Sequence, residues 1–139
     1  MKIGFTGTQQ GMTNRQYEKV IELLAEPIFY KEAHHGDCIG SDQEFHNIIR
    51  KYSPDTLIHG HPPIKTYKRA FCQFDVLYQA EDYLPRNHSI VDRTDKLIAT
   101  PKDFVEELRS GTWATIRYAK KMCKPILIVY PDGSIEEHR

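Results

Sequence analysis

The sequence predicts an α/β fold in which a mostly parallel, five-stranded sheet carries helices on both faces. Short apolar segments alternate with amphipathic segments along nearly the whole chain, as they do in doubly wound proteins. Glycine or proline follows several of the apolar segments and ends them. No internal repeat, low-complexity stretch or linker divides the 139 residues. We therefore expect residues 1–139 to form one domain.

Five apolar segments are expected to be the strands of this sheet. Because crossovers between parallel strands are right-handed, the doubly wound arrangement predicts the strand order 3-2-1-4-5, which is Rossmann-like. The switch point, where ligands bind in such sheets, then lies between the first and fourth strands. The expected strands are residues 2–6, 29–34, 56–59, 96–100 and 125–130.

Each expected helix begins at a residue that favours a helix N-terminus. Thr13 and Gln16 have the spacing of a capping box, and the apolar residues that follow recur on one helical face. Asp42, or Ser41 before it, suits the N-cap of the second helix, and Pro85 suits the first turn of the third. The last helix is expected over residues 112–122.

Residues 61–82 show no clear periodicity and are expected to form a long excursion with one short helix or strand near residues 70–78. A loop of this length in a small domain is usually either functional or a sign that an element has been missed. We expect its aromatic side chains to serve the core or a contact between subunits of a homodimer or larger homo-oligomer, rather than to stack on bases. These side chains are Tyr67, Phe71, Phe74, Tyr78 and Tyr83.

Composition excludes several classes of protein. Nineteen basic and nineteen acidic side chains give zero net charge, which argues against a nucleic-acid binder and against polybasic membrane attachment. The 40% of hydrophobic residues excludes disorder. No apolar run approaches the roughly 20 residues of a membrane span, and the first residues do not resemble a signal peptide. Three widely spaced cysteines fit reduced thiols, so a cytoplasmic location is expected.

Residues suited to an anionic ligand follow several of the expected strands. Gly7 permits a sharp turn that exposes backbone amides, and Gly111–Thr112 at a helix start offers free N–H groups to a phosphate. Arg86 is a permanent cation that can bind a phosphate through two hydrogen bonds, and Asn87 supplies a donor and an acceptor for a ribose or a base edge. The expected ligand-binding residues are Gly7, Thr8, Gln9, Gly36, Asp37, Gly40, Ser41, Asp42, Arg86, Asn87, Thr100, Pro101, Ser110, Gly111, Thr112 and Trp113.

Other motifs argue for no metal and no cofactor. The chain lacks the glycine fingerprints of dinucleotide-binding proteins and P-loop NTPases, and it lacks the nucleophile elbow of α/β-hydrolases. A metal site is considered at the ends of the second and third expected strands, but no recognised metal-ligand spacing accompanies the residues there, which are His34, His35, Asp37, His59 and His61. Cys38 is interpreted as a structural thiol.

The ordered set of these motifs resembles the SLOG superfamily, and the resemblance covers about residues 2–130. It rests on Gly4-Phe5-Thr6-Gly7, on His35-Gly36 through Gly40 and Asp42, on Arg86-Asn87, and on the helix opened by Gly111-Thr112. The superfamily includes the DNA-processing protein DprA/Smf, the LOG phosphoribohydrolases, and small single-domain members from phages and bacteria. The resemblance implies a site for a nucleotide or a nucleotide-derived, phosphorylated ribose.

The resemblance leaves three functions open. LOG enzymes carry a catalytic glutamate two or three residues after their Gly-Thr pair, whereas Ala114 and Thr115 stand there in this chain. A binding protein that acts as sensor, carrier or sequestering agent is therefore favoured. The alternatives are a LOG-like hydrolase of nucleoside monophosphates, with Glu106 or Glu107 as a substitute acid, and a DprA-like binder of single-stranded DNA.

Overall fold

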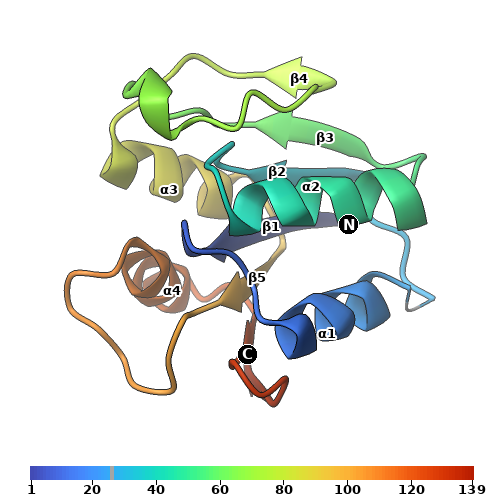
Figure 1. Cartoon of the computed structure of the whole chain (residues 1–139), viewed down its shortest axis with the longest axis vertical. Coiled ribbons are helices and arrows are strands. Elements are labelled where there is room, and N and C mark those ends of the chain that lie inside the picture. Colours follow the sequence, from blue (N-terminus) through green and yellow to red (C-terminus); the bar gives the residue numbers. More distant parts are fainter. Residues whose placement is uncertain (26) are drawn as a thin grey trace.

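A single seven-stranded sheet forms the centre of the molecule in a computed structural model, which describes residues 1–25 and 27–139 (Figure 1). The strand order is β4-β3-β2-β1-β5-β6-β7, and all pairs are parallel except β6 with β7. The inner five strands thus have the predicted order. The strands are β1 (Lys2–Gly7), β2 (Glu32–His35), β3 (Leu57–Gly60), β4 (Val76–Leu77), β5 (Lys96–Thr100), β6 (Ile126–Val129) and β7 (Ile135–His138).

The predicted count of five strands is wrong because both edges of the sheet carry a further strand. β4 has only two residues, both exposed, and it lies within the excursion that showed no periodicity. β7 pairs antiparallel with β6, and its exposed Glu136 and Glu137 give it no apolar pattern. Edge strands of this kind gain their stability from backbone pairing, which hydrophobic patterning does not reveal.

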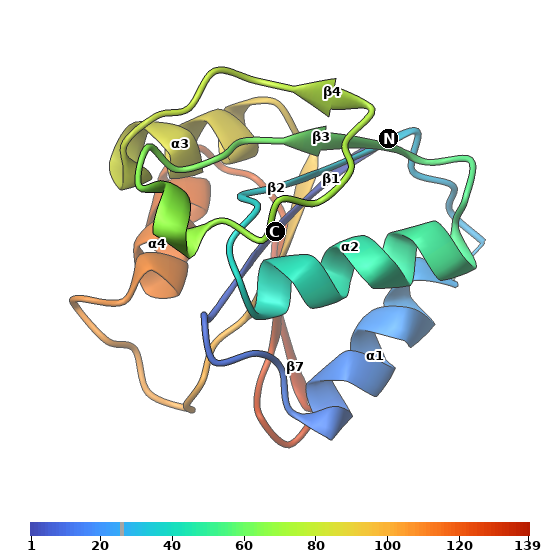
Figure 2. The same ribbon diagram turned by 45° about the horizontal axis from the view of Figure 1, so that its top comes forward.

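Four helices cover the sheet, two on each face (Figures 1 and 2). The capping box at Thr13 and Gln16 is present as predicted. Helices α1 and α2 lie on one face, whereas α3 and α4 lie on the other. Their bounds are α1 (Asn14–Leu24), α2 (Ser41–Tyr52), α3 (Tyr83–Asp92) and α4 (Gly111–Lys121). No helix in the described part of the chain is both long enough and apolar enough to cross a membrane.

Each face of the sheet has its own apolar core. On the α1 and α2 face, the rings of Phe5 and Phe45 stack at 4.4 Å and both side chains are fully buried. On the other face, Trp113 and Ile116 of α4 pack with Leu97 of β5. Burial of each such side chain stabilises the fold by about 2 kcal/mol. Because successive strand residues point to opposite faces of the sheet, apolar residues on both faces require a helix layer on each side.

Asp37 ties the excursion to the rest of the fold. Its carboxylate is fully buried and accepts hydrogen bonds from Arg69 Nε at 2.7 Å and from the Cys72 backbone N–H at 3.0 Å. Its carbonyl accepts from the Ala70 N–H at 2.8 Å. The residue adopts a positive φ of 55°, which aspartate tolerates better than most residues. The short 3-10 helix η1 (Thr66–Lys68) is thereby held against the loop after β2.

Replacing Asp37 with alanine removes the acceptor for a partly buried cation, Arg69, and for a backbone N–H. We expect D37A to lower the free energy of unfolding by about 3 kcal/mol, as measured by urea denaturation. Amide hydrogen exchange should also accelerate through the excursion. The exposed pair of Arg139 and Glu137 provides the control, since R139A should change stability by less than about 0.5 kcal/mol. A D37A protein as stable as the R139A control would contradict the anchoring role.

Candidate functional site

A cleft of about 750 Å³ opens beyond the carboxyl ends of β1 and β5, at the switch point of the sheet. Its floor is the end of β1, and its walls come from the loop after β2, from α3, and from the start of α4. The excursion reaches it through Lys68. The predicted topology placed a ligand site at this edge, and the structure has a cleft there.

Most of the predicted ligand-binding residues line this cleft. They come from the loops after β1 and β2, from the first turn of α2, from α3 and from the N-terminus of α4. They are Gly7, Thr8, Gln9, Gly36, Asp42, Arg86, Asn87, Ser110, Gly111 and Thr112. Whether they contact a ligand stays a prediction, but the separate segments do meet at one place.

The other predicted residues do not line the cleft, and several support it from beneath. Ser41 and Thr100 flank Gly7 so closely that a Cβ there would lie 2.4 Å from Ser41 Cβ and 2.6 Å from Thr100 Oγ1. Gly40 adopts a φ of +100° and packs against the Gln9 carbonyl. The residues outside the lining are Asp37, Gly40, Ser41, Thr100, Pro101 and Trp113. Asp37 anchors the excursion, the Pro101 carbonyl accepts from Gln16 Nε2 at 2.7 Å, and Trp113 is a core residue.

Sequence analysis did not select several residues that the cleft contains. Lys102 and Arg109 belong to the long loop between β5 and α4. Lys68 belongs to the excursion, and Tyr83 is the first residue of α3, directly after it. Neither segment has a hydrophobic periodicity that would predict where it folds. Glu107, which was considered only as a substitute acid, also lines the cleft.

Arg86 is the most constrained side chain at the site. The residue is 5% exposed, and its Nη1 donates to the carbonyl of Gly36 at 2.7 Å and to that of His61 at 3.3 Å. Its Nε donates to Asn87 Oδ1 at 2.9 Å, and both terminal nitrogens lie within 3.8 Å of the Cys38 sulfur. The guanidinium therefore joins α3 to the loops after β2 and β3. Only Nη2, held by a single weak sulfur contact, is left for a ligand.

Asp42 lies beside this guanidinium and shares its enclosed environment. Its carboxylate accepts from the Cys38 N–H at 3.1 Å. Burial raises the pKa of Asp42 to about 6, although the nearby Arg86 charge opposes the shift. Burial also raises the pKa of the Cys38 thiol, and the Asp42 carboxylate adds to that effect. Cys38 is consequently a poor nucleophile, in agreement with its interpretation as a structural thiol.

The N-terminus of α4 presents unpaired backbone donors to the cleft. Ser110 is the N-cap, and its hydroxyl accepts from the Trp113 N–H at 3.3 Å. No heavy atom lies within 4 Å of the position that a Gly111 Cβ would occupy, so this part of the backbone faces open space. The first turn has no acidic side chain, whereas Lys120 and Lys121 end the helix. The positive end of the helix dipole therefore points into the cleft and is not neutralised by a carboxylate of its own first turn.

Charged side chains make the cleft electropositive although the chain as a whole is neutral. Four cations line it against two carboxylates, those of Asp42 and Glu107. Such a local excess attracts anions without making the whole surface basic. The cations are Lys68, Arg86, Lys102 and Arg109.

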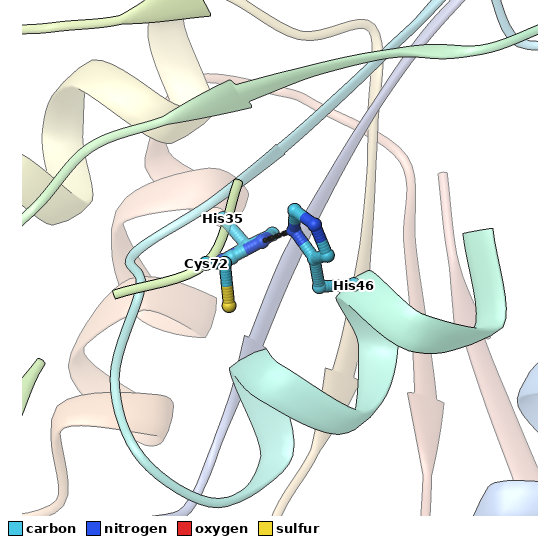
Figure 3. Close-up of side chains that lie close together, drawn as sticks. All are labelled: His35, His46 and Cys72. Atoms are coloured by element: carbon cyan, nitrogen blue, oxygen red, sulfur yellow. Dashed lines mark hydrogen bonds between the residues drawn. The ribbon is translucent and has the colours of Figure 1, made fainter. Parts of the chain in front are cut away.

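Behind the cleft, His35, His46 and Cys72 form a compact cluster that is unsuited to a metal ion (Figure 3). The Asp37 N–H donates to His35 Nδ1 at 2.9 Å, so the proton of this ring is on Nε2 and is donated to His46 Nδ1, also at 2.9 Å. A metal on Nε2 would require that proton to leave. Burial, together with the Asp37 carboxylate, raises the pKa of the Cys72 thiol to about 12, which disfavours the thiolate ligand. The cluster instead orders the loop that carries Gly36.

Comparison with known proteins shows the fold of the chain. A scan against models of protein families gave no match, and neither did a search of curated proteins. The structure is similar to that of the molybdenum cofactor binding protein from the phototrophic bacterium Rippkaea orientalis, with a TM-score of 0.70, 20% identity, and coverage of 93% of this chain and 76% of that one. It is also similar to TM1055, a structural genomics target, with a TM-score of 0.65, 17% identity, and coverage of 90% and 71%. The fold is Rossmann-like.

The fit between Gly36 and Arg86 generates a prediction. A Cβ at position 36 would lie 2.2 Å from Arg86 Nη1 and 2.7 Å from Cζ, so G36A must displace the guanidinium from its carbonyl partners. We expect a loss of about 1–3 kcal/mol in the free energy of unfolding, measured by urea denaturation. G111A is the matched control, because a Cβ at that position meets open space and alanine favours a helix. Equal stability of the two variants would show that Arg86 does not need its observed position.

Proposed function

We propose that the protein binds a nucleotide or a nucleotide-derived, phosphorylated ribose in this cleft, as a sensor, carrier or sequestering protein. The observation that carries the proposal is the meeting of unpaired α4 amides with an excess of cationic side chains at the switch point of the sheet. Both features favour a phosphate, and in this type of sheet the two occur together at the ligand site.

The remaining lining suits the sugar and base of such a ligand. Tyr83 adds an aromatic ring to the lining of the cleft, with Lys68 Nζ 5.0 Å and Arg86 Cζ 5.2 Å from its centroid. The amide of Asn87 accepts from Arg86 Nε through Oδ1, which leaves its NH₂ group for a ribose hydroxyl or a base edge. The cleft volume of about 750 Å³ lies in the range of small-ligand sites.

We also propose that the chain is a single-domain member of the SLOG superfamily, as its motifs indicate. The Rossmann-like fold and the convergence of those motifs at one cleft support this assignment. The similar structure from Rippkaea orientalis is named as a molybdenum cofactor binding protein, so this cofactor belongs among the ligands to be tested. A homo-oligomer and a cytoplasmic location remain predictions.

Calorimetry on the purified chain tests the binding proposal. The panel contains mononucleotides, cyclic nucleotides, ADP-ribose, the molybdenum cofactor and a single-stranded oligonucleotide. We expect saturable binding of at least one phosphorylated ribose compound and no salt-sensitive binding of the oligonucleotide. Absence of binding across the small-molecule panel would refute the proposal, and binding of the oligonucleotide alone would favour the DprA-like alternative.

Gly111 allows the role of the α4 amides to be tested at constant fold. Proline is tolerated at the first position of a helix, and Ser110 before it already has the extended backbone that a following proline requires. G111P removes one N–H donor, whereas G111A keeps it. We expect G111P to bind the phosphate ligand about 10-fold to 100-fold more weakly than G111A, as a lost hydrogen bond to a charged group predicts. Equal affinity measured by calorimetry would exclude this amide from the site.

The ionisation of Asp42 predicts how binding depends on pH. Its raised pKa of about 6 means that the carboxylate is protonated below that pH, which leaves the Arg86 charge uncompensated, and ionised above it. Affinity for ADP-ribose, whose pyrophosphate keeps its charge in this range, should fall about fivefold as the pH rises from 5.5 to 7.5. D42N should abolish this dependence. A pH profile that D42N leaves unchanged would assign the titration to another group.

One observation favours hydrolysis of a nucleoside monophosphate as a second candidate function. Glu107 lines the cleft, so a carboxylate is present although the glutamate position of LOG enzymes is occupied by other residues. Its Oε2 lies 3.7 Å from Lys102 Nζ. Release of free base from AMP, lost in E107Q and retained in E106Q, would establish this activity. No turnover at high protein concentration would leave binding as the function.

A further inference from the structure

A second cavity, of about 370 Å³, lies on the α3 face of the sheet near the starts of β2 and β3. It shares no lining residue with the cleft. Glu32, His34 and His59 line it, and one ligand atom from each lies within 4.8 Å of the other two. The cavity is therefore a separate place in which metal-binding side chains converge.

The pairing of two neighbouring strands produces this convergence. In the parallel register of β2 and β3, His34 is the partner of His59, and Glu32 stands two residues before His34 on the same face. Glu32 Oε1 is 2.9 Å from His34 Nε2 and 3.5 Å from His59 Nε2. Ligands on a tetrahedral zinc ion with bonds of about 2.0–2.1 Å are separated by roughly 3.3–3.5 Å. Small side-chain movements would thus bring all three atoms onto one ion.

Both histidines are also oriented through their other ring nitrogen. His34 Nδ1 is 2.8 Å from His61 Nε2, and His59 Nδ1 is 2.9 Å from the Tyr78 hydroxyl. Hydrogen bonds at the second nitrogen commonly fix the tautomer and the direction of metal-ligating histidines. His34 Nε2 donates to Glu32 Oε1 at 2.9 Å, so Nδ1 of the neutral ring accepts from His61 Nε2. A metal on His34 Nε2 would replace that proton, and Nδ1 would then donate to His61 Nε2, which accepts in its other tautomer. The Tyr78 hydroxyl can accept from His59 Nδ1, which leaves His59 Nε2 able to ligate. This distinguishes the cluster from His35 and His46, where the Asp37 N–H occupies the second nitrogen.

We propose that Glu32, His34 and His59 bind one divalent transition-metal ion, with zinc as the best match, and leave a coordination position open to the cavity. Two imidazoles and one carboxylate are the protein ligands of several open zinc sites. Nearby charges do not exclude the ion: the three cations at the cavity, Lys2, Arg93 and Lys124, are matched by the carboxylates of Asp92, Asp95 and Glu32 itself. Lys2 Nζ is 3.8 Å from Glu32 Oε2 and is one-third exposed, so it is free to swing aside.

A metal ion here would join β2 to β3. Through the hydrogen bond from His59 to Tyr78, it would also strengthen the attachment of the segment that carries β4, which has only two exposed residues of its own. Since the unfolded chain does not hold the three ligands together, zinc binding would raise the stability of the folded state.

The test uses the full chain after treatment with a chelator. Zinc is titrated against a competing fluorescent chelator, and metal content is measured by mass spectrometry after gel filtration. We expect one zinc per chain and a rise in the unfolding temperature. E32Q and H59Q should each weaken binding at least about tenfold, and Y78F should weaken it by a similar factor through the lost orienting hydrogen bond. His88, which stacks on Tyr118 away from the cluster, provides the H88Q control, which should bind normally.

Cobalt substitution separates this cluster from the one behind the cleft. Cobalt bound to Glu32, His34 and His59 should show tetrahedral d–d bands without a thiolate-to-metal charge-transfer band, and C72S should not change the spectrum. Circular dichroism shows whether each variant folds. If H59Q does not fold, E32Q still tests the site, because Glu32 is partly exposed and its replacement is less disruptive. Absence of stoichiometric binding, unchanged affinity in folded E32Q, or a charge-transfer band that C72S removes would each overturn the proposal.

Discussion

A buried guanidinium holds the cleft in its shape. Arg86 extends from α3 and donates to carbonyl groups in the loops after β2 and β3, while the Asp42 carboxylate stands close by. A charge buried in this way is tolerated only where hydrogen bonds and an opposite charge compensate it. Gly36 has no side chain where the guanidinium lies, and the whole loop after β2 is arranged around that contact. These hydrogen bonds within the protein hold the loops around the cleft in place, so the cleft is preorganised.

This arrangement changes the role that the sequence suggested for Arg86. A two-pronged grip on a phosphate would require Nη1 to leave its carbonyl partners. The structure instead leaves Nη2 and the positive charge of the group for a ligand, and the backbone amides of α4 supply the directional donors. The cleft is electropositive although the chain has zero net charge, because the cations are concentrated where the strands end.

The sequence was informative wherever local pattern and topology rules apply. The capping box at Thr13, the order of the inner strands and the meeting of Gly7, Gly36 and Gly111 at one cleft all follow from such rules. The excursion could not be predicted, because Asp37 anchors it through long-range hydrogen bonds that leave no periodic trace. Trp113 packs in the apolar core and does not line the cleft, which the sequence left open, since a tryptophan at a helix start suits either a ligand or the core and only packing decides. The pairing of His34 with His59 likewise depends on strand register, which single-sequence patterns do not determine.

We propose that separate loops present backbone amides and one guanidinium to a phosphorylated ribose at the switch point of the sheet. Nuclear magnetic resonance on isotope-labelled protein tests this arrangement by following every backbone amide during titration with the ligand that calorimetry selects. We expect the largest shifts on Gly7, Gly36, Gly111 and Thr112, with the Arg86 side-chain signals moving in parallel. Saturable shifts confined to another surface, with these resonances unmoved, would contradict it.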